Sequence, residues 1–199
     1  MADSRTYNDG TKEMLLSRAI DLFYEKGYAG ASVRDIVKAV NVTNSILYHH
    51  FKDKNELLYV IIERIGLELI RSLKLVEQQY DDPMERLSRM IYTQICIVKE
   101  RKREVKIFLE EQYQLGPRYK TGILRQHREI YNLYLNQLNA LENRGMLRNV
   151  DKTVVNFAIN AMMNWSYRWY REDGPLSIDE VAGFITDIFF HGILKKIEK

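Results

Sequence analysis

The scarcity of helix-breaking residues constrains the fold of this chain more than any other feature of its sequence. Three prolines and ten glycines are spread over 199 residues, and most fall between stretches whose apolar residues recur three and four positions apart. Such spacing marks amphipathic helices, whereas the Val- and Thr-rich alternating runs that indicate strands are few. The sequence therefore predicts an all-α fold, with about nine helices and no sheet.

Capping residues set the expected helix boundaries. Ser32 with Asp35 has the pattern of a capping box, in which the hydroxyl and the acid each bond a backbone N–H of the first turn. Gly27 is expected to end the first helix in the left-handed conformation that glycine adopts without strain. Together such signals predict further helices at about residues 33–40, 43–50, 53–79, 83–99, 105–114, 118–143, 151–171 and 177–196.

The length of the expected helices changes along the chain. The first three are short and closely connected, whereas the later ones are longer and more aromatic, and a fourth helix of about 25 residues joins the two parts. A chain of this length suits one domain or two small ones. We therefore expect a small helical module over residues 1–53 and a larger helical bundle over residues 54–199.

Composition excludes several classes of protein. A hydrophobic fraction of 46% with 29% charged residues excludes a disordered chain. The single cysteine, Cys96, excludes an internal disulfide and a multi-cysteine zinc site, and it fits a reducing compartment. The N-terminus carries no apolar signal segment and no run of about 18 apolar residues occurs, so a cytoplasmic protein without a membrane span is expected.

The charge of the chain does not by itself indicate a nucleic-acid partner. The net charge is only +3, and within residues 1–60 eight Lys and Arg residues are cancelled by eight Asp and Glu residues. Any contact with DNA must therefore depend on where individual cations stand. Few phosphate ion pairs per subunit are expected.

One short segment carries the pattern of a DNA-binding unit. SVRDIVKAV and TNSILYHHF are two short helices joined by a tight turn at Asn41 and Val42. In a helix-turn-helix the second helix enters the major groove, while helix N-termini and flanking cations hold phosphates. Short hydrogen-bonding side chains on the second helix, aromatic groups one turn later and nearby cations suit these roles. The candidate DNA-binding residues are Ser32, Arg34, Thr43, Asn44, Ser45, Tyr48, His49, Lys52 and Lys54.

The order of residues around this unit resembles that of the TetR family of bacterial transcriptional repressors. The resemblance runs from Lys12 to Leu58 and is carried by AIDLFYEKGYAGASVRDIVKAVNVTNSILYHHFKDKNELL, read from Ala19. It implies an all-helical homodimer in which each subunit reads one half-site of a near-palindromic DNA operator. It also implies that residues 1–53 form a helix-turn-helix DNA-binding domain and that residues 54–199 form a helical domain for ligand binding and dimerisation, which binds a small effector.

Three residues depart from the family's pattern. Members commonly carry glycine at the position of Ser45, a small residue at that of Ile46 and alanine at that of Val37. Ile46 leaves two alternatives open, because its side chain can pack within the module or contact the methyl group of a thymine.

The last two helices carry apolar residues on two faces each. In the helix after Asp151, one face holds Val154 and Trp165 and the other holds Val155 and Ile159. A helix that is apolar on two sides must be covered on two sides, and the simplest cover is the subunit core on one side and a symmetry mate on the other. A thick monomeric core is the alternative. The candidate dimer-interface residues are Val155, Ile159, Phe184, Ile188, Phe189 and Gly192.

An effector site in the C-terminal domain would be an apolar interior with a few polar groups. Asn160 and Asn164 lie one helical turn apart, and buried amides need hydrogen-bond partners, which a ligand or the bundle itself can supply. Aromatic residues at helical spacing are also typical of an ordinary core. The candidate effector-binding residues are Gln94, Gln112, Tyr113, Tyr131, Tyr134, Asn160, Asn164, Trp165, Arg168 and Trp169.

The segment MNWSYRWYREDGPLSIDEVA adds a second resemblance. It is similar to the end of TetR-family members that sense acyl-CoA thioesters in fatty-acid or steroid catabolism. This resemblance implies a long, partly apolar effector, with Arg168 or Arg171 meeting a phosphate. The alternative is that both arginines are solvated cations favoured by a helix C-terminus.

Enzymatic and metal-binding functions find no support in the sequence. His49 and His50 are adjacent and point to different sides of a helix, and His127 and His191 are isolated, so no metal pair is formed. Cys96 lies between two isoleucines and is expected to pack as an apolar residue rather than act as a nucleophile. No catalytic motif occurs, so we expect neither an enzyme nor a cofactor or metal.

The predicted function combines these observations. It is a dimeric repressor that binds a palindromic operator and is released by a small apolar effector, such as an acyl-CoA or a fatty-acid-like molecule. The alternative is an all-helical protein-binding module without sequence-specific DNA binding.

Overall fold

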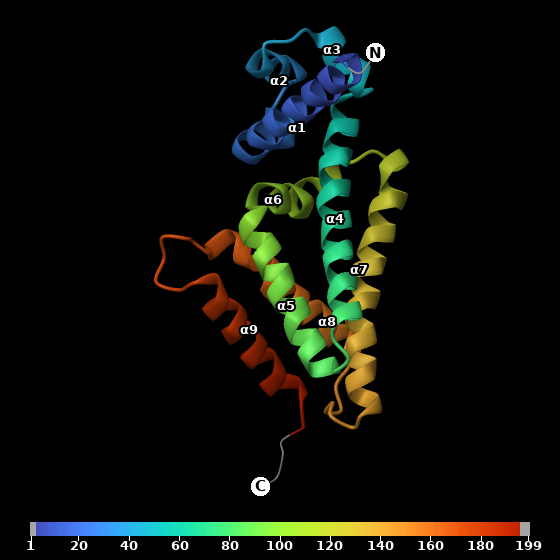
Figure 1. Cartoon of the computed structure of the whole chain (residues 1–199), viewed down its shortest axis with the longest axis vertical. Helices are drawn as coiled ribbons and strands as arrows, with labels where there is room; N and C mark the ends of the chain where they lie inside the picture. Colours follow the sequence, from blue (N-terminus) through green and yellow to red (C-terminus); the bar gives the residue numbers. More distant parts are fainter. Residues whose placement is uncertain (1–2, 196–199) are drawn as a thin grey trace. The chain divides into compact units, whose positions relative to one another are not determined.

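The structure, a computed structural model, describes residues 3–195 of the chain. The all-α prediction is confirmed, and within these residues the only strand-like pairing is an isolated bridge between Leu147 and Leu194. The elements, labelled in Figure 1, are α1 (Asp3–Gly30), α2 (Val33–Val40), α3 (Asn44–His50), α4 (Lys54–Gln79), α5 (Pro83–Glu100), α6 (Lys102–Glu111), the 3₁₀ turn η1 (Gln112–Gln114), α7 (Pro117–Asn143), α8 (Lys152–Trp169) and α9 (Ile178–Ile193).

The chain forms two compact units that interleave along the sequence. The first unit contains the residues up to Gly66 together with Arg103–Leu124, and the second contains Leu67–Lys102 and the residues from Arg125 onward. The long helices α4 and α7 therefore each contribute to both units. The sequence predicted a single boundary, between residues 53 and 54, that separates a DNA-binding domain from an effector domain. This functional boundary stays a prediction.

The core of the first unit joins the three N-terminal helices to α4, α6 and α7. The prediction that the first three helices are all short is wrong for α1, which has 28 residues, whereas α2 and α3 have eight and seven. The buried members of this core are Leu15, Leu16, Ala19, Phe23, Ala31, Ile36, Val37, Leu47, Phe51, Leu57, Leu58, Ile61, Ile62, Ile107, Leu115, Tyr119 and Ile123. Because most of these residues come from the helix-turn-helix and its flanking helices, this core holds the candidate DNA-binding surface in place.

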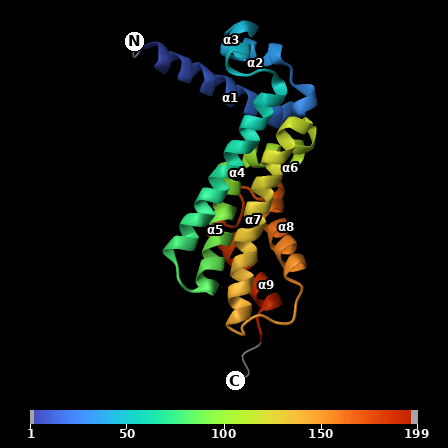
Figure 2. The same cartoon turned by 90° about the vertical axis from the view of Figure 1, so that its right-hand side faces the viewer.

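The second unit is a helical bundle in which α5 packs against both α8 and α9. In both Figure 1 and Figure 2 the C-terminal half of α4 lies beside α7, and Lys74 of α4 pairs with Glu129 of α7 at 2.5 Å. The core draws on α4, α5, α7, α8 and α9, with Tyr134 fully buried among apolar side chains. None of the helices that the structure describes combines the length and apolar character needed to cross a bilayer.

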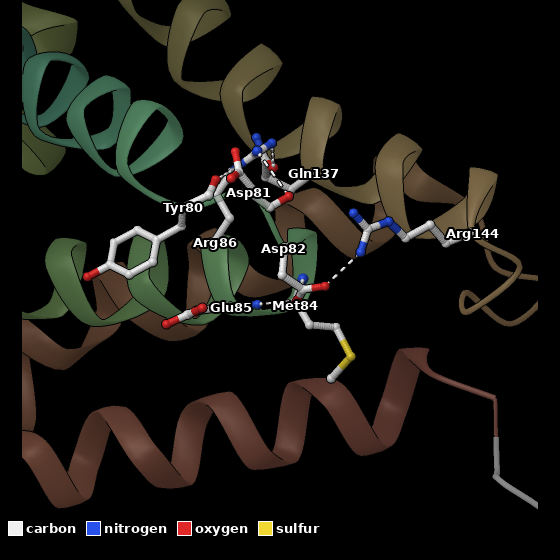
Figure 3. A network of polar contacts seen from close by, with 8 residues as sticks. All are labelled: Tyr80, Asp81, Asp82, Met84, Glu85, Arg86, Gln137 and Arg144. Carbon is white, nitrogen blue, oxygen red and sulfur yellow. Dashed lines mark hydrogen bonds and ion pairs between the residues drawn. The ribbon is translucent and has the colours of Figure 1, made fainter.

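The turn between α4 and α5 is fastened to α7 by a polar network (Figure 3). Arg86 donates from Nε to the carbonyl of Tyr80 at 2.8 Å and from a guanidinium nitrogen to Oε1 of Gln137 at 3.2 Å. Asp82 accepts two backbone N–H groups of the first turn of α5, each at 3.0 Å, and pairs with Arg144 at 2.6 Å. The start of α5 is thus fixed by its cap and by α7.

Helix ends differ from the expected boundaries at a few places. Gly27 has the expected positive φ of 72°, but its ψ of 162° is extended, so the glycine kinks α1 and helical residues continue to Gly30. The charged run separates α5 from α6 at Arg101 alone, and α6 therefore begins at Lys102 rather than near residue 105. The last helix ends at Ile193, and the expected end at Lys196 lies outside the described residues.

Candidate nucleic-acid interface

The turn between α2 and α3 is set by local hydrogen bonds. At its start, α2 has the predicted capping box, since Ser32 Oγ accepts from the N–H of Asp35 at 3.1 Å and Asp35 accepts from the N–H of Ser32 at 3.0 Å. Hydrogen bonds from the hydroxyl and backbone of Ser32 hold the pKa of Asp35 below its usual range. At its end, Asn41 adopts the left-handed conformation (φ 58°, ψ 45°), and the N–H of Val42 returns to the carbonyl of Val37 at 3.0 Å. The chain is thereby redirected into α3.

Helix α3 presents a polar face to solvent. Leu47 is the one fully buried side chain of this helix and anchors it to the core. At about 100° per residue, the positions two before and two after Leu47, Ser45 and His49, point away from the core. The α2 and α3 candidates on the predicted surface are all exposed: Ser32, Arg34, Thr43, Asn44, Ser45, Tyr48 and His49. Thr43 occupies the N-cap position of α3 without a side-chain cap bond.

The two candidate lysines after α3 have different surroundings. Lys52 is exposed. Lys54 donates from Nζ to the carbonyls of Tyr28 and Ala31 at 2.8 and 2.9 Å and lies 4.1 Å from the centre of the Tyr28 ring. Burial lowers the pKa of Lys54. Because two of the three N–H donors of its ammonium hold the end of α1, only one remains for a phosphate, and the predicted role of Lys54 as a phosphate ligand is secondary to this structural one.

Sequence reasoning missed the contacts that α6 makes with the end of α1 in the first unit. Lys106 donates to the carbonyl of Tyr24 at 3.0 Å and lies over the ring of that tyrosine. Glu111 accepts the N–H of Tyr28 at 3.0 Å, next to the kink at Gly27. The charged run before α6 is the only signal for these contacts, and by pattern alone it predicts no more than a helix interruption. These bonds satisfy backbone groups that the kink leaves without helical partners.

Four of the effector candidates come together in the core of the second unit. Tyr134 donates to Oε1 of Gln94 at 2.8 Å, and Nε2 of Gln94 donates to Oδ1 of Asn164 at 2.9 Å and of Asn160 at 3.4 Å. Asn160 in turn donates to Oδ1 of Asn156 at 3.0 Å. Burial raises the pKa of the Tyr134 hydroxyl well above its usual range. The amides therefore bond to one another within the bundle, as one of the two sequence alternatives expected, and they form a polar network inside an apolar core.

The other effector candidates lie elsewhere. Trp165 and Trp169 are 56% and 47% exposed on α8, so they stand apart from the polar network of the core, and their contact with an effector stays a prediction. Arg168 is also exposed, with its guanidinium 4.6 Å from the centre of the Trp165 ring. Two candidates belong to η1 in the first unit, Gln112 and Tyr113, of which Tyr113 is 80% exposed. The hydroxyl of Tyr131 donates to Thr153 Oγ1 at 3.3 Å near the start of α8.

The outer face of α8 and α9 carries exposed apolar side chains, which we name the outer apolar face. Its large members are Val154, Phe157, Trp165, Trp169, Phe184 and Ile188. Two of the predicted interface residues, Phe184 and Ile188, belong to it, and Gly192 is exposed beside them. Assigning Val155, Ile159 and Phe189 to a dimer interface is wrong, because these residues are 8%, 1% and 4% exposed within the subunit's own core. Both helices are apolar on two sides, so the sequence could not tell which side faces inward.

The surroundings of Cys96 and His127 disfavour the charged forms of both side chains. Burial raises the pKa of the Cys96 thiol, which disfavours the nucleophilic thiolate. Burial lowers the pKa of His127, because it disfavours the charged imidazolium. Among residues 10–195, whose side chains the structure describes, no three His, Cys, Asp or Glu side chains gather in a way that could hold a metal ion.

Two family models match the chain. One, described as bacterial regulatory proteins of the tetR family, covers residues 15–60, which include α2 and α3. The other, described as the tetracyclin repressor-like C-terminal domain, covers residues 80–193. The two matches thus include the exposed face of α3 and the polar network of the second unit.

Relatives and solved structures agree with these models over nearly the whole chain. The transcriptional repressor KstR2 of Mycobacterium tuberculosis is 26% identical over 185 residues, which are 92% of each chain. A structure of the ketosteroid transcriptional regulator KstR2 of Mycobacterium tuberculosis has a TM-score of 0.85 at 26% identity and covers 93% of this chain and 95% of that one. A structure of AibR in complex with isovaleryl coenzyme A and operator DNA has a TM-score of 0.83 at 27% identity, with 90% and 98% covered.

The sequence resemblance, the helix-turn-helix geometry and these matches lead to one assignment. The exposed polar face of α3 suits contact with DNA, and the exposed apolar residues of α8 and α9 suit contact between two subunits. This chain belongs to the TetR family of bacterial regulatory proteins.

Proposed function

We propose that the protein is a repressor whose dimer binds a palindromic operator through α3 and releases it when an acyl-CoA or a similar apolar effector binds the second unit. The observation that carries the DNA-binding part is the face of α3, where five polar candidates are exposed while Leu47 anchors the helix. Thr43, Asn44 and Ser45 supply short hydrogen-bonding groups for base edges. Arg34 and Lys52 supply exposed cations for phosphates.

The effector part of the proposal rests on the polar network of the second unit. The side-chain amides of Gln94, Asn160 and Asn164 carry N–H groups that can donate to a carbonyl group of a ligand. Tyr134 also contacts the sulfur of Met163 at 3.7 Å and the carbonyl of Met90 at 3.3 Å. Methionine side chains adapt to irregular apolar ligands, so this region suits an acyl chain with a polar group at one end.

The comparisons support an acyl-CoA as the effector class. AibR was crystallised with isovaleryl coenzyme A and operator DNA together, and KstR2 is described as a ketosteroid regulator. In this proposal the outer apolar face is covered by a second copy of the chain, the protein works in the cytoplasm, and it carries no catalytic activity.

The test of the whole proposal measures operator binding and release in one experiment. The full-length protein is used to select duplexes from a random DNA pool, and the affinity for the selected duplex is measured by fluorescence anisotropy with and without isovaleryl-CoA and longer acyl-CoAs. We expect at least one acyl-CoA to weaken operator binding, while free coenzyme A does not. Failure to select any duplex at low salt would refute DNA binding, and an affinity unchanged by every acyl-CoA would refute this effector class.

A pair of variants locates the effector site. Asn164→Leu removes one amide from the polar network, and Asn149→Leu makes the same change at an exposed position of the second unit. We expect the first variant to bind the operator but to lose release by the active acyl-CoA, and the second to behave as the wild type. Equal release in both variants would place the effector elsewhere.

A further inference from the structure

We infer that Ile46 determines part of the operator sequence by contacting the 5-methyl group of a thymine in each half-site. This inference rests on the proposed function of α3 and adds a base preference to it. The observations that carry it are the exposure of Ile46, its place on α3 and the chemistry of the major groove.

Ile46 is one of the exposed apolar residues of its unit. Its side chain is 38% exposed. Val40 and Val42, by contrast, are partly buried and pack against the core of that unit. Of the two roles that the sequence left open, contact with a base is the one for which this exposed surface is available.

The position of Ile46 places it at the edge of the polar face of α3. Relative to the inward Leu47, Ile46 lies about 100° to one side and Tyr48 about 100° to the other, with Ser45 and His49 between them on the outward side. A helix that inserts this outward side into the major groove brings Ile46, on the flank of that side, toward the base edges on the floor of the groove. Its neighbours on this face are polar, so Ile46 is the apolar position of an otherwise hydrogen-bonding surface.

The chemistry of the groove selects thymine as the partner of this side chain. Thymine alone presents a methyl group in the major groove, whereas the other bases present only hydrogen-bond donors and acceptors there. An isoleucine placed over those polar edges would remove water without replacing its hydrogen bonds, which costs free energy. Because β-branched side chains in helices have one dominant χ1 rotamer, Ile46 loses little conformational freedom on contact.

The test removes the methyl group and nothing else. Once the full-length wild-type protein has selected its operator, each thymine is replaced in turn by deoxyuridine, and affinities are measured at fixed salt. We expect one thymine in each half-site at which the substitution weakens binding about fourfold, and about fifteenfold when both half-sites carry it, from about 0.8 kcal/mol per buried methyl-sized group. The wild-type protein is used for this step, so no variant needs to fold.

Two variants assign the effect to Ile46. In Ile46→Ala the affinities for the thymine and deoxyuridine duplexes should become equal, whereas Leu124→Ala, a change at an exposed leucine of the same unit, should keep the wild-type difference. An operator in which no thymine is sensitive to the loss of its methyl group, or a sensitivity that Ile46→Ala retains, would overturn the contact while leaving operator binding intact. Failure to select any operator would overturn operator binding and this contact together.

Discussion

At the scale of single residues, Lys52 and Lys54 have separate roles although they stand two positions apart. The ammonium of Lys54 bonds two carbonyls at the end of α1, and that of Lys52 is exposed. In Lys54→Met the aliphatic stem is kept and both bonds are removed. Because a hydrogen bond to a charged group contributes about 1.5–3 kcal/mol, we expect the free energy of unfolding to fall by about 2 kcal/mol. Urea denaturation measures this change.

Lys52→Met is the matched control. We expect its stability to stay within about 0.5 kcal/mol of the wild type, as for most surface substitutions. Its operator affinity should fall, and the salt dependence of binding should decrease by about one for each phosphate that the variant no longer neutralises. If the two variants were destabilised equally, the assignment of a structural role to Lys54 alone would be wrong.

The sequence predicted exposure better than it predicted contacts. The polar candidates of α2 and α3 are exposed as expected because Ile36 and Leu47 take the few inward positions of these short helices. The contacts of Lys54 and Glu111 with the end of α1 were not predictable. The kink at Gly27 leaves the N–H of Tyr28 to be bonded, the end of α1 leaves carbonyl groups to be bonded, and the partners come from helices farther along the chain.

At the scale of the helices, the caps set a pH dependence of stability. Hydrogen bonds from the backbone of Glu85 and Met84, together with the ion pair to Arg144, lower the pKa of Asp82 from the ordinary value of 3.8. A carboxyl whose pKa is lower in the folded than in the unfolded state stabilises the protein above its unfolded pKa, and this contribution is lost as the pH falls through the folded pKa. The wild type should therefore lose stability as the pH falls below about 4.

Asp82→Asn tests this dependence, because asparagine remains a good N-cap residue but does not titrate. We expect the variant to be less stable than the wild type at pH 7, and the difference to shrink as the pH falls toward 2. Thermal melts across this range measure both slopes. Asp81→Asn is the control, since Asp81 contributes its backbone carbonyl to the same network. If the difference in stability between the wild type and Asp82→Asn stayed constant with pH, the Asp82 carboxylate would not be the cause of the pH dependence.

Helix boundaries were more predictable than helix faces. Ser32, Asp82, Asp151 and Ser177 all cap helices where the sequence placed them, because capping is a local interaction of a few residues. The inward face of α8 was assigned incorrectly for the interface. That choice depends on which apolar side meets α5, a contact between segments far apart in the sequence.

At the scale of the whole molecule, the outer apolar face makes dimerisation testable. Phe184 and Ile188 are large apolar residues that are more than half exposed on α9, and exposed apolar patches of this kind mark protein interfaces. A charge at the centre of such a patch would be buried without a partner in a dimer. We therefore expect Ile188→Glu to be a folded monomer by sedimentation equilibrium. Leu75→Glu, a matched change at an exposed leucine of α4, should remain dimeric.

The monomeric variant also tests how a nearly neutral DNA-binding module reaches useful affinity. The charges of residues 1–60 cancel, so each subunit is expected to contribute few phosphate contacts, and the dimer doubles them. Because the logarithm of the binding constant falls with the logarithm of salt concentration in proportion to the number of phosphates neutralised, Ile188→Glu should bind the operator with about half the wild-type salt slope. It should also bind far more weakly, since it engages only one half-site. A monomer that kept the full slope would show that one subunit makes all the phosphate contacts, and the symmetric assignment of half-sites would then be wrong.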